Sequence, residues 1–159
     1  MNMGSLVLKA RDLTGKITDR LGFLAPLLIR LTVGLVFIGT GWGKLHTLPD
    51  VTEFFTSLHI PFPALNARVV ATTEFVGGIL IVVGLGSRLV ALPLAFTMVI
   101  AILTAKLDKI DGITTLVGFE EWSYLVMFLV IALTGPGALS LDALLMRRLA
   151  RKQPPGAMA

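Results

Sequence analysis

The chain contains no cysteine and carries little charge. Asp, Glu, Lys and Arg make up only 15% of its 159 residues, against about 25% in soluble domains. The absence of cysteine excludes disulfides, Fe–S clusters, zinc–thiolate sites and thiol redox chemistry within this polypeptide. Hydrophobic residues reach 55%, and the mean hydropathy is +0.85. A soluble domain of this length needs more polar surface, so the composition indicates a membrane protein.

Four apolar segments predict membrane-spanning helices, and they cover residues 21–43, 65–85, 89–105 and 122–139. Each approaches the ~20 residues that cross ~30 Å of hydrocarbon as a helix. The third segment and most of the fourth are apolar nearly all round, which disfavours a soluble bundle of amphipathic helices. The predicted fold is therefore all-α, a polytopic membrane protein with four transmembrane helices in an antiparallel bundle.

The basic residues predict the orientation of this bundle. Nine Lys and Arg residues precede the first segment, lie between the second and third, or follow the fourth, whereas four lie on the opposite side. The excess of positive charge marks the cytoplasmic side, so both termini are predicted to be cytoplasmic. These cations lie at helix ends and form no continuous stripe, which argues against nucleic acid as a partner. No small-residue cleavage site follows the first segment, which is therefore predicted to stay uncleaved.

The flanking regions divide the chain into three parts. We expect residues 1–20 to form a cytoplasmic amphipathic arm that lies on the lipid headgroups, and residues 21–146 to form the membrane domain. Residues 147–159 are expected to form a basic, disordered tail. In the outer connection, Asp50 and Glu53 have the spacing of a capping box, and Pro61 ends the pattern. This predicts a short helix over the outer mouth of the bundle.

Besides Arg68 near the start of the second segment, two charged residues lie deeper inside the apolar segments, Arg30 in the first and Glu74 in the second. Either one facing lipid would cost ~2.5–3.5 kcal/mol, so both are expected to face the bundle interior. Glycines share their helix faces and allow two backbones to approach, or leave room for a planar guest. We expect Arg30 and Glu74 to pair across this glycine groove, with Cα atoms ~9 Å apart in depth.

Two interpretations of this pair stay open. It could only specify the fold, or Glu74 could bind or relay a proton for a redox-active guest. In the second case the predicted catalytic residues are Glu74 and Arg30, and the predicted cofactor-binding residues are Gly34, Gly41, Lys44, Gly77, Gly78 and Arg88. The two histidines, His46 and His59, have no third ligand beside them. No haem, Fe–S cluster or metal is therefore expected.

Three motifs resemble the DoxX family. The spacings Arg30-x-x-x-Gly34-x-x-Phe37-x-x-x-Gly41-x-x-Lys44 and Glu74-x-x-Gly77-Gly78-x-Leu80-x-x-x-Gly84-x-x-x-Arg88 are similar to its first two helices. Gly135-Pro136-Gly137, followed by Ser140-Leu141-Asp142, resembles the turn that closes the fourth. The likeness covers residues 24–146. Lys106 stands where we expect a histidine in many members of this family.

The resemblance implies a bacterial inner-membrane protein whose relatives are linked to thiosulfate:quinone oxidoreductase, to quinone and catechol detoxification, or to oxidative and thiol stress. It implies a quinone as cofactor, and the lipid bilayer with a soluble oxidoreductase or a second copy as partners. The predicted function is a quinone-linked membrane subunit of an oxidoreductase system, with the quinone near Arg30 and Glu74. The alternative is a non-enzymatic membrane scaffold or assembly factor that docks soluble redox enzymes, and a small transporter is a third possibility.

Overall fold

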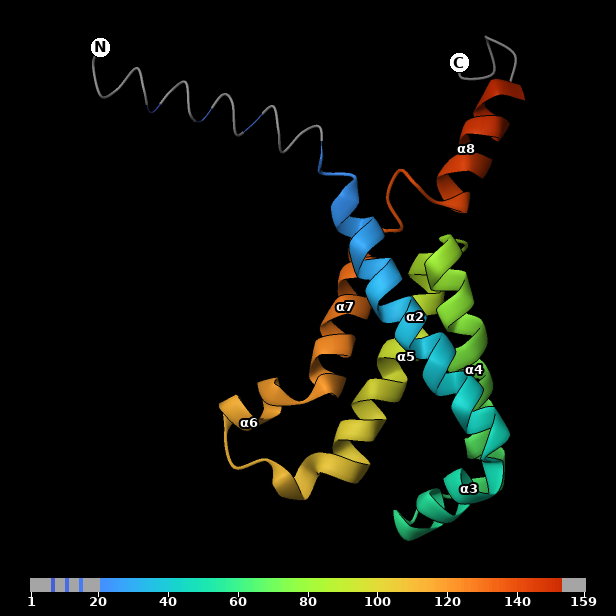
Figure 1. Ribbon diagram of the computed structural model, residues 1–159, viewed down its shortest axis with the longest axis vertical. Coiled ribbons are helices and arrows are strands. Elements are labelled where there is room, and N and C mark those ends of the chain that lie inside the picture. The colour runs from blue at the N-terminus through green and yellow to red at the C-terminus, as the bar shows by residue number, and fades with distance from the viewer. Residues whose placement is uncertain (1–6, 8–10, 12–14, 16–20, 153–159) are drawn as a thin grey trace, which may run out of the picture.

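The computed structural model describes residues 21–152 together with residues 7, 11 and 15 (Figure 1). The amphipathic arm predicted for residues 1–20 lies almost entirely outside the described residues, as do residues 153–159. Every regular element in the described part of the chain is helical, with no strand. The predicted all-α fold class is therefore confirmed.

The described helices follow one another with short connections. In chain order they are α2 (Leu24–His46), α3 (Leu48–Ser57), α4 (Pro63–Val83), α5 (Ser87–Ala101), a π-helical turn (Ile102–Lys106), a 3-10 turn (Leu107–Lys109), α6 (Ile113–Gly118), α7 (Glu120–Thr134) and α8 (Leu141–Lys152). Pro49 occupies the first turn of α3, where its missing N–H costs no hydrogen bond. The short helix predicted there is confirmed, but no side-chain cap bond forms at its start.

Three helices are long and apolar enough to span a membrane. They are α2, α4, and α5 with its continuation to Lys109. The fourth predicted segment folds as α7, which has 15 residues and is shorter than a usual span. The count of four spans therefore stays a prediction.

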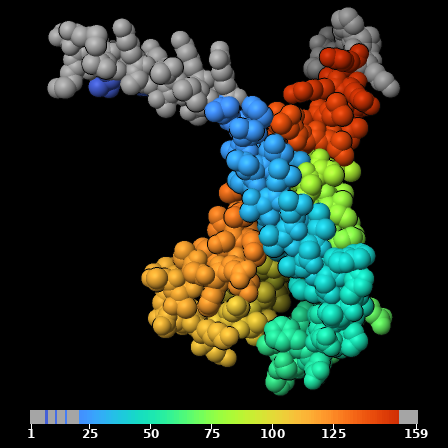
Figure 2. Space-filling model, in the orientation of Figure 1, coloured from blue at the N-terminus to red at the C-terminus, as the bar shows by residue number. Residues whose placement is uncertain are grey.

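The helices pack as two antiparallel pairs, α2 with α4 and α5 with α7. The pairs meet around a core that includes Val33, Phe37, Ile81, Leu94, Phe128 and Ile131. Figure 1 shows them spreading apart toward the end that carries α3 and α6, and Figure 2 shows two lobes at that end. We call this the α3 end, the space between the lobes the fork, and the opposite end the α8 end.

Helix α8 overlaps the stretch that we expected to be disordered. The prediction is wrong for residues 147–152, because α8 continues to Lys152. The hydroxyl of Ser140 explains where the helix begins, since it accepts a hydrogen bond from the backbone N–H of Ala143 at 3.1 Å. This bond satisfies one of the free donors of the first turn.

Candidate functional site

The glycines of α2 and α4 bring the two helix backbones into direct contact. A Cβ atom built on Gly34 would lie 2.6 Å from the side chain of Val82, and one on Gly78 would lie 2.7 Å from the backbone N of Ile38. A Cβ on Gly41 would collide with the backbone of Phe75. The groove that we expected to admit a planar guest is therefore filled by the opposite helix. The glycines determine how closely α2 and α4 pack.

Gly77 faces the other helix pair. A Cβ built there would lie 3.0 Å from the side chain of Leu94 in α5. The adjacent glycines therefore serve two contacts, Gly78 toward α2 and Gly77 toward α5.

The contact of Gly41 with Phe75 also fixes the depth of Glu74. It places Glu74 level with residues 41–42 of α2, about 12 residues from Arg30, which corresponds to ~18 Å along the helix axis. This is twice the separation that we expected, and an arginine side chain is too short to cross it. The predicted Arg30–Glu74 pair is wrong: each residue has other partners.

Arg30 lies at the α8 end, where it is 1% exposed and bonded entirely to backbone. Its Nε donates to the carbonyl of Ile81 at 2.8 Å and its Nη2 to that of Val82 at 2.6 Å. Its Nη1 donates to the carbonyls of Pro136 and Leu139 at 2.7 and 2.8 Å. The last turn of α4 has carbonyls without helical partners, and a cation is favourable there. Arg30 thus ties α4 to the connection between α7 and α8.

Two more polar residues strengthen the α8 end. Asp142 accepts the backbone N–H of Gly86 at 2.9 Å, and its own N–H donates to the carbonyl of Gly84 at 3.0 Å. Arg88 makes a longer bond to the carbonyl of Thr134 at 3.4 Å. Gly84 has φ +75° and lies against the Arg30 guanidinium, a position that a side chain would occupy only with strain. We call Arg30, Arg88 and Asp142 the α8-end network.

Glu74 lies in the half of the molecule toward the α3 end, and only 1% of it is exposed. Its Oε1 lies 2.5 Å from Nζ of Lys44, and the hydroxyl of Thr40 donates to its Oε2 at 3.2 Å. The Lys44 side chain is 33% exposed. An ammonium has three N–H donors, so two remain after the bond to Glu74. We call Thr40, Lys44 and Glu74 the Glu74 site.

The Glu74 site opens toward the fork. Phe37, Thr40 and Lys44 follow one another at i, i+3 and i+7, so they lie on one face of α2. Phe37 packs edge-on against Tyr124 and Phe128 of α7, with ring centroids 5.5 and 4.8 Å apart. Phe37 is therefore directed toward α7, while Thr40 and Lys44 on the same side of α2 contact Glu74 of α4. Because the helix pairs diverge toward the α3 end, this side of α2 lies next to the fork, between the aromatic contact and the α3 end (Figure 1).

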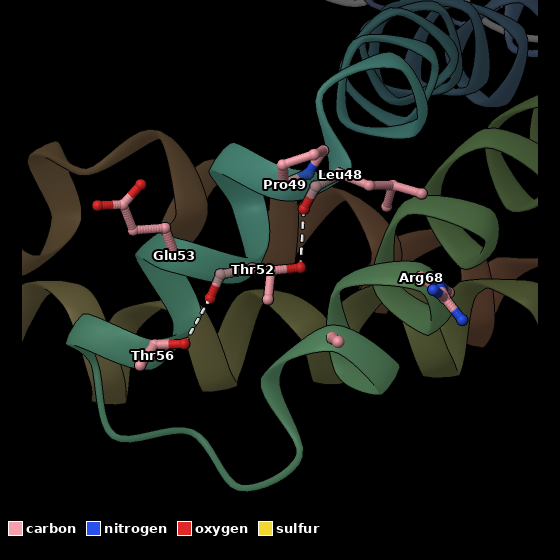
Figure 3. Close-up of a pocket in the computed structure, with 7 residues that line it drawn as sticks. Leu48, Pro49, Thr52, Glu53, Thr56 and Arg68 are labelled. Atoms are coloured by element: carbon pink, nitrogen blue, oxygen red, sulfur yellow. Dashed lines mark hydrogen bonds between the residues drawn. The ribbon is translucent and has the colours of Figure 1, made fainter.

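A hollow of about 560 Å³ lies between α3 and α4, and its lining residues are drawn in Figure 3. Glu53 and Arg68 lie on opposite sides of it. The hydroxyls of Thr52 and Thr56 are bonded back to their own helix at 2.8 Å. The polar groups therefore do not converge on one point, and the Glu74 site is the stronger candidate.

Comparison with known proteins identifies the family of the chain. The sequence profile of the DoxX family matches residues 25–107. The chain belongs to the DoxX family. It is 34% identical to "Putative oxidoreductase CatD" of Bacillus subtilis over 75% of this chain and 85% of CatD. It is 31% identical to "Inner membrane protein YqjF" of Escherichia coli, over 77% and 92%, and 32% identical to "Inner membrane protein YphA" of the same species, over 73% and 86%. No solved structure matches.

This DoxX protein is accordingly a bacterial multi-pass membrane protein. Its predicted site residues separate into two groups. Arg30 and Arg88 belong to the α8-end network, whereas Glu74 and Lys44 form the Glu74 site with Thr40. The four predicted glycines lie at the contacts that hold α2 against α4 and α4 against α5.

The sequence analysis missed Thr40 and the pairing of Lys44 with Glu74. A signal for both was available in the spacing. Thr40 and Lys44 are four residues apart on the same face as Phe37, and a register set by the glycines would have placed Glu74 beside them. The prediction instead pairs Arg30 with Glu74, the two charges that lie deepest in their apolar segments.

Proposed function

We propose that this protein is a quinone-linked membrane subunit of an oxidoreductase system in the bacterial inner membrane, with the quinone ring in the fork beside the Glu74 site. The observation that carries the proposal is the buried carboxylate of Glu74, held by a lysine whose side chain is one-third exposed. An ionisable pair within a membrane segment marks a functional site more often than a structural one.

The residues of the Glu74 site fit a quinone in three respects. Lys44 has two N–H donors left for a ring oxygen. Glu74 can hold a proton beside that oxygen, with Thr40 donating to its other oxygen. The rings of Phe37 and Tyr124 form an aromatic surface at the base of the fork. A bound quinone would supply two-electron chemistry coupled to protons, with the electrons delivered by a soluble oxidoreductase partner.

The other predicted residues have supporting roles in this proposal. Gly34, Gly41 and Gly78 keep α2 close enough to α4 for Lys44 to reach Glu74, and Gly77 seats α5. Arg30 and Arg88 hold the α8 end and do not touch the ring. We assign the α8 end to the cytoplasm because of its excess of basic residues. In this assignment α7 is the fourth span.

A binding titration on the purified full chain in lipid nanodiscs tests the proposal. Decylubiquinone is the probe, and its dissociation constant is measured by quenching of tryptophan fluorescence. A hydrogen bond from a charged donor is worth ~1.5–3 kcal/mol, so Lys44→Met should weaken binding about 10-fold or more. Glu53→Gln, which changes an exposed carboxylate on α3, should leave the constant unchanged. Equal binding by wild type and Lys44→Met, or no binding at all, would contradict the proposal.

The alternative function is a scaffold that docks soluble redox enzymes, and α8 favours it. This helix exposes Leu145, Met146 and Leu149 and also carries Arg147, Arg148 and Arg151. Such a mixed apolar and basic helix suits an acidic protein surface or the anionic membrane surface. Co-purification of a soluble oxidoreductase that is lost on removing residues 145–159, but kept in Glu74→Gln, would favour docking without quinone chemistry.

A further inference from the structure

A second hollow, of about 420 Å³, lies at the α8 end between the start of α2, the end of α4, and α8 with the connection before it. Six of its ten lining residues are leucine or valine: Leu27, Val82, Val83, Leu139, Leu141 and Leu144. Proteins bind small molecules in hollows of ~300–1,000 Å³ whose lining is mostly apolar, with a few polar groups. This hollow has the size and the lining of such a site, and the proposed function does not use it.

The hollow reaches from the level of the lipid headgroups to the level of the acyl chains. Helix α2 begins at Leu24 and α4 ends at Val83, and the ends of membrane-spanning helices lie near the headgroups. Arg30, which also lines the hollow, follows Leu24 by six residues, or ~9 Å along the helix axis. None of the ten described residues that line the hollow is aromatic. The aliphatic wall therefore suits a flexible hydrocarbon chain better than a ring.

Both charged residues that line the hollow are arginines. Arg147 is exposed and follows Leu144 by three residues, so the two lie on the same side of α8. A guanidinium can bind a phosphate group through two parallel hydrogen bonds. Arg30 is 1% exposed and has only one N–H donor left, so it contributes positive charge to the hollow rather than a contact. The hollow therefore favours a group that carries negative charge.

The acidic residue of α8, Asp142, does not line the hollow. Its carboxylate accepts the backbone N–H of Gly86 instead. An acidic protein surface could pair with the arginines of α8, but it would leave an aliphatic hollow open to water. A molecule with a hydrocarbon chain and an anionic head suits both parts of the hollow, and phospholipids of the surrounding bilayer are such molecules.

We propose that the hollow binds one anionic phospholipid, with an acyl chain against the leucine and valine side chains and the phosphate on Arg147. A ligand that binds only the folded protein stabilises it, so this lipid strengthens the end that the α8-end network holds together. The inference goes beyond the proposed function, because it needs no quinone. Only the choice of leaflet, the cytoplasmic one, follows from the orientation assigned there.

The experiment uses the delipidated full chain in dodecyl maltoside, a neutral detergent without a charged surface. Three lipids with the same palmitoyl and oleoyl chains are compared by native mass spectrometry: phosphatidylglycerol, phosphatidylcholine and diacylglycerol. The wild type should bind one phosphatidylglycerol at least about 10-fold more tightly than diacylglycerol, which lacks the phosphate that accepts hydrogen bonds from Arg147. Phosphatidylcholine should bind more weakly than phosphatidylglycerol, because its choline cation is repelled by the arginines of α8. Phosphatidylglycerol should also raise the unfolding temperature the most.

Two neighbouring arginines give matched variants. Arg147→Met should weaken the binding of phosphatidylglycerol about 10-fold or more and leave the binding of diacylglycerol unchanged. Arg148→Met removes the same charge from the next residue of α8, which does not line the hollow. It should weaken the binding of phosphatidylglycerol less than about 5-fold, which is the usual worth of one exposed ion pair.

Three results would overturn the inference. Equal binding of phosphatidylglycerol and either other lipid to the wild type would mean that the hollow does not select an anionic head. Equal losses in Arg147→Met and Arg148→Met would mean that anions are attracted to α8 as a whole. An equal rise in unfolding temperature with inorganic phosphate would assign the site to a free anion, since a chain should add about 4-fold in affinity for each buried CH₂ group. No quinone is present, so the proposed function is tested separately.

Discussion

The two ends of the molecule use buried charge differently. At the α8 end, Arg30 donates four hydrogen bonds, all to backbone carbonyls of segments far away in the sequence. At the α3 end, Glu74 is paired with a lysine that is one-third exposed, and Glu121 has a buried oxygen with no partner among the described residues. Four of the five N–H donors of the Arg30 guanidinium are used in this way, so only one is left for a ligand. Charges that are bonded to side chains at the edge of a fork keep that capacity.

This contrast predicts that the α8-end network governs stability and that the Glu74 site governs binding. In both regions an isolated charge in an apolar segment is the visible feature of the sequence. What distinguishes them is the partner: backbone carbonyls for Arg30, and a partly exposed lysine ammonium for Glu74. Variants at the α8 end should therefore lower the stability of the protein, whereas variants at the Glu74 site should weaken ligand binding.

Arg30→Met should have the largest effect on stability. It removes four hydrogen bonds from a charged donor to backbone carbonyls, one of them buried and three part-buried, and a bond of this kind is worth ~1.5–3 kcal/mol. We expect a loss of more than ~4 kcal/mol, seen as failure to accumulate in the membrane or as a strongly lowered unfolding temperature in detergent. Arg88→Met removes one long bond on an exposed residue and should cost less than ~1 kcal/mol. If Arg30→Met were as stable as the wild type, the α8-end network would not govern stability.

Breaking the Lys44–Glu74 pair should have the next largest effect. Glu74→Leu leaves the ammonium of Lys44 without its counter-ion. Breaking a buried ion pair in this way lowers the free energy of unfolding by ~3–5 kcal/mol. The loss should be smaller here, because Lys44 is partly exposed. The double variant Lys44→Met/Glu74→Leu should recover most of the lost stability, because both charges are gone. Binding of decylubiquinone should stay lost. Recovery of binding together with stability would show that the pair is purely structural.

Gly78→Ala should have a smaller effect on stability. The added Cβ would lie 2.7 Å from the backbone of Ile38, so α2 and α4 must move apart at a cost of ~1–3 kcal/mol. Gly39→Ala is the matched control on α2, because a Cβ there meets nothing within 4 Å. It should be neutral or slightly stabilising, since alanine favours helix. Equal unfolding temperatures for the two variants would contradict the role assigned to glycine.

The sequence predicted the helical fold, the antiparallel glycine contacts and the two charges that matter, but it paired those charges wrongly. Hydropathy and spacing determine which residues face inward, whereas the axial offset between α2 and α4 depends on which glycine meets which backbone. A shift of two turns was enough to exchange Arg30 for Lys44 as the partner of Glu74. The helix at residues 147–152 is not predicted because the composition of residues 147–159 indicates disorder. The helix begins earlier in the chain, where Ser140 bonds to its first turn. The orphaned oxygen of Glu121 has no signature in the sequence at all.

The smallest expected effect is the coupling between the two ends. Arg30 and Glu74 are ~18 Å apart along the helix axis and share no partner, so their variants should act independently. A double-mutant cycle with Arg30→Lys and Glu74→Gln, milder changes that keep the protein folded, should give an interaction energy below ~0.5 kcal/mol in thermal or denaturant unfolding. Lys44→Met with Glu74→Gln is the positive control, since these residues touch. A coupling of ~1 kcal/mol or more between Arg30 and Glu74 would mean that α2 transmits strain along its length, and the division into a stabilising end and a binding end would have to be abandoned.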